Sequence, residues 1–505
     1  MQVRVAAGDI TTYDAPCIVV NLFEGITAPG GATGAVDAAL GGMISELIQA
    51  GDIRGKDGEL TMIHTFGKLA APRVLVAGLG KAGDFTVDKV RDLSASIARY
   101  MLGRRVADYA TITHGAGIAG LDAEACAEAV ADGTLLGLYR FDRHKKPNDD
   151  AFEVQTLTIV EHDAGKVARL QAAAERGVIL GESVEFARDL ANEPGNVLTP
   201  TEFAARAEAM AASYGLGVRI LDRDQAGEMG MGAFLGVARG SAQPPKFIVL
   251  TYNGGGESKP LGLVGKGITF DTGGISIKPS EGMLEMKGDM SGGGAVIAAM
   301  MAIARLKPKI NVTALVPATE NMPGGNAIKP TDVLRAMNGK TIEVINTDAE
   351  GRVILADALS YAVQLDLSPI VDVATLTGAI SISLGNVAYG VFANNDGLVE
   401  RIKNAAKAAG EKCWELPMFS EYKELNKSNV ADVKNSGGRG AGSIAAAFFL
   451  KEFVDDRPWA HLDIAGVDFY DKEKGVLTKG ASGIPVRTLV NLVLSLAEEK
   501  RPSAQ

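Results

Sequence analysis

The amino-acid sequence predicts an α/β protein with two domains, and three observations lead to this class. The chain has 505 residues, which is too long for one ordinary hydrophobic core. Strand-like runs of apolar residues alternate with runs whose apolar residues recur every three or four positions, as in helices. Apolar residues make up 47% of the chain and charged residues 22%, a composition typical of globular proteins with a large core.

The first third of the chain predicts a smaller amino-terminal α/β domain over residues 1–165. Helical spacing of apolar residues predicts helices over 34–50, 87–102 and 123–136. The strands predicted between and around them lie at 3–5, 17–20, 73–77, 110–113 and 154–160.

A glycine-rich segment in this domain has the pattern of a dinucleotide-binding loop. Residues 78–83, Gly-Leu-Gly-Lys-Ala-Gly, follow a predicted strand and fit Gly-x-Gly-x-x-Gly. The loop also requires an acidic residue about 20 positions further on, at the end of the next strand. Residues 98–101 instead fall inside a predicted helix. We therefore interpret these glycines as a turn, and a nicotinamide oxidoreductase stays as an alternative that cofactor fluorescence would test.

A long helical pattern over residues 166–190 stops ahead of Pro194 and Gly195 and predicts a helix that connects two domains. Beyond it, a helix at 203–214 and strands at 218–221 and 247–250 begin a second α/β pattern. The second domain is predicted over residues 191–505.

Charge and cysteine content narrow the class of protein. The formal net charge of −10 argues against a general nucleic-acid-binding or membrane-binding surface. The amino terminus lacks a basic segment followed by an apolar one, and we expect no apolar stretch long enough to span a bilayer. The three cysteines are far apart and suit a reducing compartment. A cytoplasmic protein is expected.

Two acidic residues and an arginine lie close together in a heptapeptide of the second domain, residues 346–352, Asn-Thr-Asp-Ala-Glu-Gly-Arg. It follows a strand-like run at 341–345 and precedes a helical pattern, and ligands collect at such strand ends in open α/β sheets. If the backbone stays extended, the side chains of Asp348 and Glu350 project to one side. The alternative is that Asp348 caps the helix and Glu350 complements its dipole.

A second group of charges lies upstream, between residues 264 and 294. Lys266 and Asp271 lie among apolar strand-like residues, where an unpaired charge is costly, so both need partners. Lys278 and Asp289 follow, and Asp289 precedes a glycine-rich helix start. The alternatives are a buried ion pair with glycine turns, or a phosphate-binding helix start. The second is weaker because the Gly-x-x-x-x-Gly-Lys-Ser/Thr motif is absent.

Together the two groups offer four carboxylates, those of Asp271, Asp289, Asp348 and Glu350. If they converge they repel one another strongly, and two divalent metal ions would balance their charge. Oxygen ligands suit Mg²⁺, Mn²⁺ or Zn²⁺. No histidine lies near these segments in the sequence, and His461 is far downstream. The residues alone thus favour a dinuclear metallohydrolase.

These segments resemble the leucyl aminopeptidase family, the cytosol aminopeptidases of peptidase family M17. The resemblance extends from about Asp189 to Val490, and more loosely over the amino-terminal domain. Only small differences, at Ser482 and Pro485, depart from the family pattern. The matching segments are 196–200, 264–278, Asp289, 346–352 and 372–379.

The resemblance implies a metal-dependent exopeptidase that releases amino-terminal residues, preferably Leu or other apolar ones, by attack of a metal-bridging water or hydroxide. It implies a larger catalytic domain with a mixed central β-sheet flanked by helices, and a homohexamer acting on peptides with a free amino terminus. Two alternatives from other classes stay open, a phosphoester hydrolase and a non-enzymatic DNA-binding hexamer. A phosphatase screen and a gel shift would test them.

The resemblance also implies roles for individual residues. Two metal ions, Zn²⁺ and/or Mn²⁺ with Mg²⁺ as a further candidate, would be bridged by Asp271 and Glu350. Lys266 and Asp289 would complete the ligands of one ion and Asp348 those of the other. The catalytic residues would be Lys278, which stabilises the developing gem-diolate, and Arg352, which holds a bicarbonate ion as general base. The substrate-binding residues would be Met286, Asn346, Thr375, Leu376 and Gly378.

Overall fold

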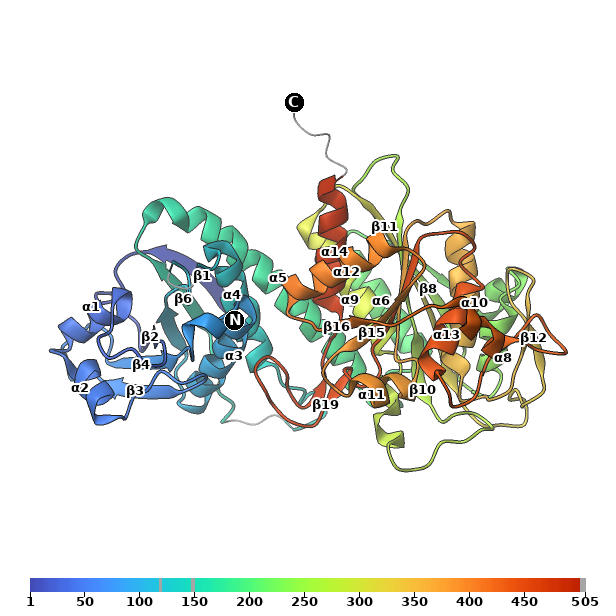
Figure 1. Ribbon diagram of the computed structural model, residues 1–505, viewed down its shortest axis with the longest axis horizontal. Coiled ribbons are helices and arrows are strands. Elements are labelled where there is room, and N and C mark those ends of the chain that lie inside the picture. Colours follow the sequence, from blue (N-terminus) through green and yellow to red (C-terminus); the bar gives the residue numbers. More distant parts are fainter. Residues whose placement is uncertain (118–119, 147–149, 500–505) are drawn as a thin grey trace. The chain divides into compact units, whose positions relative to one another are not determined.

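The computed structural model describes residues 1–117, 120–146 and 150–499, which form two compact units (Figure 1). The first unit comprises Met1–Glu182 and Lys472–Thr478, and the second comprises Ser183–Asp471 and the chain from Lys479 onward. Helix α5, Val167–Asn192, belongs to the first unit up to Glu182 and to the second from Ser183. The boundaries 1–165, 166–190 and 191–505 stay predictions.

The first unit is built on a six-stranded sheet in the order β1-β6-β5-β2-β4-β3. All neighbouring strands are parallel except the edge pair β3 and β4. The strands are β1 Gln2–Ala7, β2 Ile18–Leu22, β3 Leu60–His64, β4 Arg73–Gly78, β5 Asp108–Thr111 and β6 Thr156–Glu161. The helices are α1 Gly31–Ala39, α2 Met43–Ala50, α3 Val87–Gly103 and α4 Ala123–Leu138.

Two details of this unit differ from the sequence prediction. The single helix predicted over 34–50 is two helices, because Gly41 and Gly42 have φ angles of 75° and 87° and break the helical path. Strand β3 was not predicted, since it is a mostly half-buried edge strand without a clear apolar alternation.

The glycine-rich segment 78–83 runs from the end of β4 through a short loop into the 3₁₀ helix Ala82–Asp84. Gly78 ends β4, and a Cβ atom there would lie 2.0 Å from the carbonyl oxygen of Lys56. Gly80 has a φ of 71°. Residues 98–101 lie inside α3, so the position at which the fingerprint requires a ribose-binding acid is not the end of a strand. Gly78 thus permits close packing against Lys56, and Gly80 permits a left-handed backbone conformation.

The second unit is built on a nine-stranded mixed sheet, in the order β16-β15-β18-β14-β9-β11-β8-β7 with β10 paired to β11. The pairs β7–β8, β8–β11 and β15–β18 are antiparallel and the others are parallel. The strands are β7 Gly217–Leu221, β8 Lys246–Asn253, β9 Leu261–Gly265, β10 Gly267–Asp271, β11 Asn311–Asn321, β14 Ile370–Ala374, β15 Tyr389–Ala393, β16 Cys413–Glu415 and β18 Trp459–Asp463.

Helices cover this sheet on both sides (Figure 1). One group consists of α6 Pro200–Tyr214, α9 Ser291–Leu306, α12 Asp396–Ala409 and α14 Val486–Glu499. The other consists of α8 Gly232–Ala238, α10 Glu350–Gln364 and α13 Gly442–Lys451. The strands β9 and β14 are buried along their whole length, as expected for strands covered on both faces. The predicted α/β class, with two domains and a mixed sheet flanked by helices, is confirmed.

One helical run, Met283–Leu306, is long and apolar enough by composition to cross a membrane, contrary to the expectation from the sequence. However, 89% of its most apolar window is buried inside the structure. The run includes α9, whose residues from Ser291 to Ala304 are all buried. Its apolar character is therefore that of a core helix.

Candidate active site

Parallel strands of the central sheet bring the upstream charges together. Strand β10 ends at Asp271, Lys266 directly follows β9, and Thr375 directly follows β14. The strands β9, β10 and β14 all run in the same direction, so their carboxyl ends lie at the same edge of the sheet. The sheet thus delivers charged side chains to that edge.

The heptapeptide reaches the same place from a different sheet. The strand before it, β13 Thr341–Glu343, belongs to a three-stranded sheet with β12 Val333–Arg335 and β17 Val433–Lys434. Thr347 and Asp348 form a turn, so the extended backbone considered from the sequence is wrong. The N-cap of α10 is Ala349, which makes no side-chain cap, so Asp348 is not the helix cap.

Hydrogen bonds hold the heptapeptide loop in place. The side-chain oxygen of Asn346 accepts a bond of 2.9 Å from the backbone N–H of Asp348. Asn435, on the loop after β17, donates to the carbonyl of Asn346 at 2.7 Å and accepts from the N–H of Ile345 at 2.8 Å. The loop is thus fixed by two asparagines before any ligand arrives.

The two groups of acidic residues converge. Asp271, Asp348 and Glu350 each offer a carboxylate oxygen, and these oxygens lie within 4.8 Å of one another. Lys266 joins Asp289 to them, since its Nζ lies 2.7 Å from Asp289 Oδ1 and 2.8 Å from Glu350 Oε1. All of these residues are buried except Asp348, which is half-buried. The four predicted metal-ligand carboxylates and Lys266 therefore form one cluster.

Lys278 supplies the second positive charge of the cluster. Its Nζ lies 2.7 Å from Asp271 Oδ2 and 2.5 Å from Asp348 Oδ1. Burial alone would lower the pKa of Lys278, but Asp271 and the other carboxylates raise it above the usual range. Burial and the charge of Glu350 in turn raise the pKa of Asp271. Four carboxylates and two ammonium groups leave the cluster with a formal charge of −2.

Three buried polar atoms of the cluster and of Arg352 make no hydrogen bond within the described part of the chain. They are Oδ2 of Asp289, Nε of Arg352 and Oδ1 of Asp348, the last of which is in an ion pair with Lys278. Arg352 donates from Nη1 to the carbonyl of Asn435 at 2.9 Å, and burial lowers its pKa to about 10. An unsatisfied carboxylate oxygen beside an excess of acids fits a hard or borderline cation. An unsatisfied guanidinium N–H fits an anion.

The glycines of the site are explained by close packing. A Cβ atom on Gly292 would lie 2.2 Å from the carbonyl oxygen of Val373. The N–H of Gly293 donates to the carbonyl of Lys266 at 2.7 Å. The glycine-rich start of α9 therefore faces strand backbone, which rules out the phosphate-binding interpretation. Gly351 leaves room for Lys266, because a Cβ there would lie 2.6 Å from Lys266 Cε.

The predicted substrate-binding residues lie around the cluster in different ways. Thr375 Oγ1 donates to Asp289 Oδ1 at 2.7 Å, and its carbonyl accepts from Lys266 Nζ at 3.0 Å. Gly378 is exposed and begins helix α11, Gly378–Leu384. Met286 is half-buried in the 3₁₀ helix Met283–Gly288 and does not belong to the buried core. Leu376 is half-buried and donates its N–H to Asp463 at 3.0 Å.

Several residues that support the site were not singled out from the sequence. Asn321, at the end of β11, donates from Nδ2 to Asp271 Oδ1 at 2.7 Å and to the carbonyl of Thr347 at 3.0 Å. Thr347 Oγ1 donates to the carbonyl of Gly273 at 2.6 Å. Asn321 thus ties the heptapeptide loop to β10. The only sequence signal was a polar residue at the end of a long apolar strand.

A buried histidine also lies next to this edge of the sheet, although the sequence position of His461 suggested otherwise. His461 on β18 is paired in register with Asp372 on β14, and its Nδ1 lies 2.6 Å from Asp372 Oδ1. Trp459 Nε1 donates to the other oxygen of Asp372 at 2.7 Å. Burial lowers the pKa of His461, but Asp372 outweighs it and the net shift is upward. His461 is thus bonded to the neighbouring strand β14, which leads into Thr375.

This fold and this acidic cluster define a hydrolase of the two-domain metallopeptidase type, and comparison with known proteins agrees. The model of the cytosol aminopeptidase family, catalytic domain, matches residues 185–490, and that of the family's N-terminal domain matches residues 19–148. The chain belongs to the cytosol aminopeptidase family. It is accordingly a metal-dependent aminopeptidase.

Relatives match along the whole chain. A probable cytosol aminopeptidase of Alkaliphilus metalliredigens is 46% identical over 499 residues, covering 98% of this chain and 100% of its own. One from Solibacter usitatus is 46% identical over 500 residues, covering 98% and 99%. A mutant of tomato leucine aminopeptidase superposes with a TM-score of 0.86 at 33% identity, covering 98% and 97%. The bottromycin maturation enzyme BotP in complex with Mn gives 0.84 at 34% identity, covering 96% and 100%.

Proposed function

We propose that the protein releases leucine and other apolar residues from the free amino terminus of peptides at a centre of two divalent metal ions. The observation that supports this most is the convergence of Asp271, Asp348 and Glu350 within 4.8 Å, with Lys266 and Asp289 joined to them. Zn²⁺ and Mn²⁺ are the candidate ions, with Mg²⁺ as a third, because the donors are carboxylate oxygens and one amine.

In this proposal Asp271 and Glu350 would hold both ions. Lys266 and Asp289 would hold one of them, and Asp348 would hold the other. When bound, the ions supply a hydroxide nucleophile at neutral pH and polarise the scissile carbonyl. Lys266 has to lose its proton to act as a ligand, which lysine can do and arginine cannot. In the structure Lys266 forms ion pairs with Asp289 and Glu350. The carboxylates that would bind the metal ions are therefore the same ones that neutralise the charge of Lys266.

Lys278 and Arg352 would carry the remaining chemistry. The ammonium group of Lys278, which is half-buried and paired with Asp271 and Asp348, would donate to the oxyanion that develops on the substrate carbonyl. Arg352 would hold bicarbonate through its free Nε, and the bicarbonate would act as the general base. This division of roles explains how a site with only a buried, carboxylate-paired histidine nearby could move protons.

Five residues would bind the substrate: Met286, Asn346, Thr375, Leu376 and Gly378. A half-buried methionine gives an adaptable apolar wall, which suits Leu or Met side chains and discriminates weakly among apolar ones. Asn346 would act through the loop, because its side chain already holds the N–H of Asp348.

The proposal extends to assembly and location. A homohexamer in the cytoplasm is proposed, supported for location by relatives that are named cytosol aminopeptidases. The net charge of −10 favours peptide substrates over nucleic acid as partners.

Hydrolysis of leucine p-nitroanilide with added Mn²⁺, before and after chelation, tests the proposal. Metal-dependent release from the free-amine substrate, absent for the N-acetylated substrate and for Asp348→Ala, is the expected result. A folded, fully metallated enzyme that is inactive on a panel of amino-terminal residues would overturn the assignment of apolar exopeptidase specificity.

A further inference from the structure

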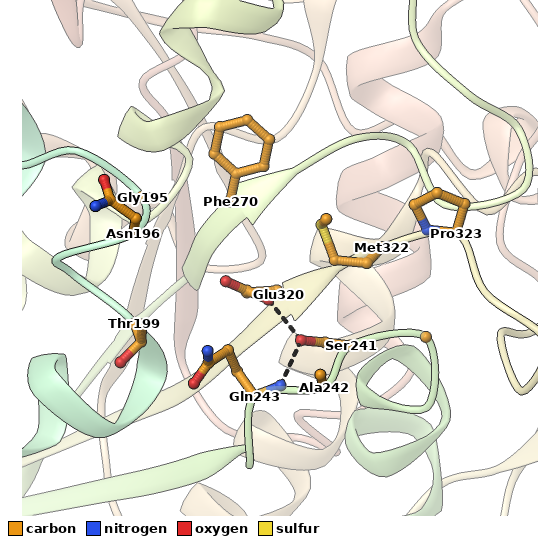
Figure 2. Close-up of a pocket in the computed structure, with 11 residues that line it drawn as sticks. Gly195, Asn196, Thr199, Ser241, Ala242, Gln243, Phe270, Glu320, Met322 and Pro323 are labelled. Carbon is orange, nitrogen blue, oxygen red and sulfur yellow. Dashed lines mark hydrogen bonds between the residues drawn. The ribbon is translucent and has the colours of Figure 1, made fainter.

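A pocket of about 600 Å³ lies in the second unit beside the ends of β10 and β11 (Figure 2). It is bounded by the loop before α6, by the loop between α8 and β8, and by the two strands. Its lining residues are Gly195, Asn196, Thr199, Gly240, Ser241, Ala242, Gln243, Phe270, Glu320, Met322 and Pro323.

This pocket is distinct from the acidic cluster. Phe270 is paired across the strands with Glu320, and the next pair is Asp271 with Asn321. Successive side chains of a strand point to opposite faces. Phe270 and Glu320 line the pocket, whereas Asn321 turns the other way and donates to Asp271. The pocket and the cluster therefore lie back to back on the same two strands.

Among the described residues that line the pocket, Glu320 is the only charged one. Its Oε2 accepts a hydrogen bond of 2.5 Å from Ser241 Oγ, which in turn accepts from the N–H of Gln243 at 2.9 Å. No lysine or arginine of the described ranges pairs with Glu320. This differs from the four carboxylates of the acidic cluster, each of which has a lysine partner. Glu320 is thus an oriented carboxylate whose charge the protein leaves unmatched.

The rest of the lining suits the organic part of a ligand. Figure 2 shows the Glu320 carboxylate in the middle, with Asn196, Thr199 and Gln243 on one side and Met322 on the other. The amide and hydroxyl oxygens can accept further hydrogen bonds from an N–H donor. The ring of Phe270 and the thioether of Met322 provide apolar surface, and an aromatic face also attracts cations.

The walls of the pocket are preformed. A Cβ atom on Gly240 would lie 1.9 Å from the carbonyl oxygen of Met322, and one on Gly195 would lie 3.0 Å from the Phe270 ring. Both loops therefore pack directly against the strands through glycine. A rigid wall lowers the ordering cost of binding a ligand.

We propose that this pocket binds a small organic cation, an alkylammonium or alkylguanidinium compound of amino-acid size, with Glu320 as its anionic partner. A metal ion is a poorer fit, because one carboxylate and a space of about 600 Å³ do not give the close oxygen shell that Mg²⁺ or Ca²⁺ needs. An anion would meet the unmatched charge of Glu320. The proposal concerns a second site and does not depend on the peptidase assignment.

Calorimetric titration of the full-length, Mn²⁺-loaded protein with butylammonium and butylguanidinium tests this proposal. At least one cation is expected to bind, with butanol and butyrate at least about tenfold weaker, since they lack the charge that pairs with Glu320. Glu320→Gln should weaken cation binding at least about tenfold. Glu257→Gln, an exposed residue outside the lining, makes the same change in net charge and should leave the affinity unchanged.

Binding at the metal centre is distinguished by Asp348→Ala, which should bind the cation as tightly as the unaltered protein does. Loss of binding in Asp348→Ala with retention in Glu320→Gln would overturn the proposal, as would equal affinities for butylammonium and butanol. Absence of measurable binding for both cations would also overturn it. If Glu320→Gln does not fold, Ala242→Lys introduces a competing ammonium group at the exposed lining residue Ala242. Unchanged cation affinity in that variant would then contradict the proposal.

Discussion

Each unit contains a buried network of acids and bases, and the two networks differ in the cation they use. In the first unit Arg91 donates from Nε to both oxygens of Asp132 at 3.0 and 2.9 Å, and from Nη1 to Asp88 at 2.9 Å. In the second unit, two lysines share four carboxylates, and Oδ2 of Asp289 has no hydrogen-bond partner within the described residues.

The difference separates a structural ion pair from a reactive site. A guanidinium bonds carboxylates strongly and keeps its proton, so the Arg91 network is locked. An ammonium group is a point charge that can lose its proton, so the lysine network can be rebuilt around metal ions. Buried charge alone therefore does not distinguish a functional site. The distinguishing features are an excess of carboxylates over cationic side chains and a lysine that can lose its proton.

The largest effect on activity is expected when a lysine of the second network is replaced by arginine. Lys266→Arg keeps the positive charge but removes the amine that can be deprotonated, so kcat/KM on leucine p-nitroanilide should fall about 10³-fold or more. Thermal unfolding should show that the variant folds. Activity within tenfold of the unaltered enzyme would mean that Lys266 is not a metal ligand.

The reciprocal change in the first unit should affect stability and leave the chemistry alone. Arg91→Met leaves Asp132, which is fully buried, without the guanidinium, and breaking a buried pair in this way costs about 3–5 kcal/mol. Denaturant unfolding measures the loss, and Lys89→Met, at a half-exposed ion pair, is the control with an expected cost below about 1 kcal/mol. A large drop in kcat of the folded Arg91→Met variant would contradict the distinction.

The sequence predicted most of the elements and the charged residues of the site, for a physical reason. Apolar periodicity is local, so strands such as β4 and helices such as α3 could be located from it. Lys266 and Asp271 lie in apolar surroundings within their own segment, so their need for partners was visible.

What could not be predicted depends on contacts between distant segments. The sheet order is one example, and the separate small sheet that carries β13 is another. Asn321, Asn435 and Asp463 were missed because each is an ordinary polar residue until its partner, 26 to 90 positions away, is known. His461 was misjudged for the same reason, since β18 lies beside β14 only in the folded sheet.

Metal ions should stabilise the lysine network and leave the arginine network unchanged. A ligand at about 100 times its Kd stabilises the folded state by about 2.7 kcal/mol, so Mn²⁺ should raise the unfolding temperature of the chelated protein. Asp348→Ala should lose most of this rise, whereas Arg91→Met should keep it. An equal rise in Asp348→Ala and the unaltered protein would place the stabilising ions away from the acidic cluster.

Asp357 is a third kind of buried acid, with no cation partner in the described part of the chain, and should give the smallest effect and a distinctive dependence on pH. Asp357 on α10 accepts from the backbone N–H groups of Phe234 at 2.8 Å and Met337 at 2.7 Å. Burial raises its pKa from 3.8 to about 7. In the folded state Asp357 therefore holds a proton that the unfolded chain has already released, so its contribution to stability falls as pH rises from about 4 to about 7 and then levels off.

The Asp357→Asn variant isolates this contribution. As the pH rises from 5 to 8, the unaltered protein should lose stability relative to the variant. The difference between their unfolding free energies should change by about 1–2 kcal/mol, after allowance for relaxation around the site. Asp132→Asn is the matched comparison, because its carboxylate has an arginine partner. A difference for Asp357→Asn that is constant with pH would mean that the backbone N–H groups alone keep Asp357 ionised, and that a buried acid in this fold needs no cation to stay charged.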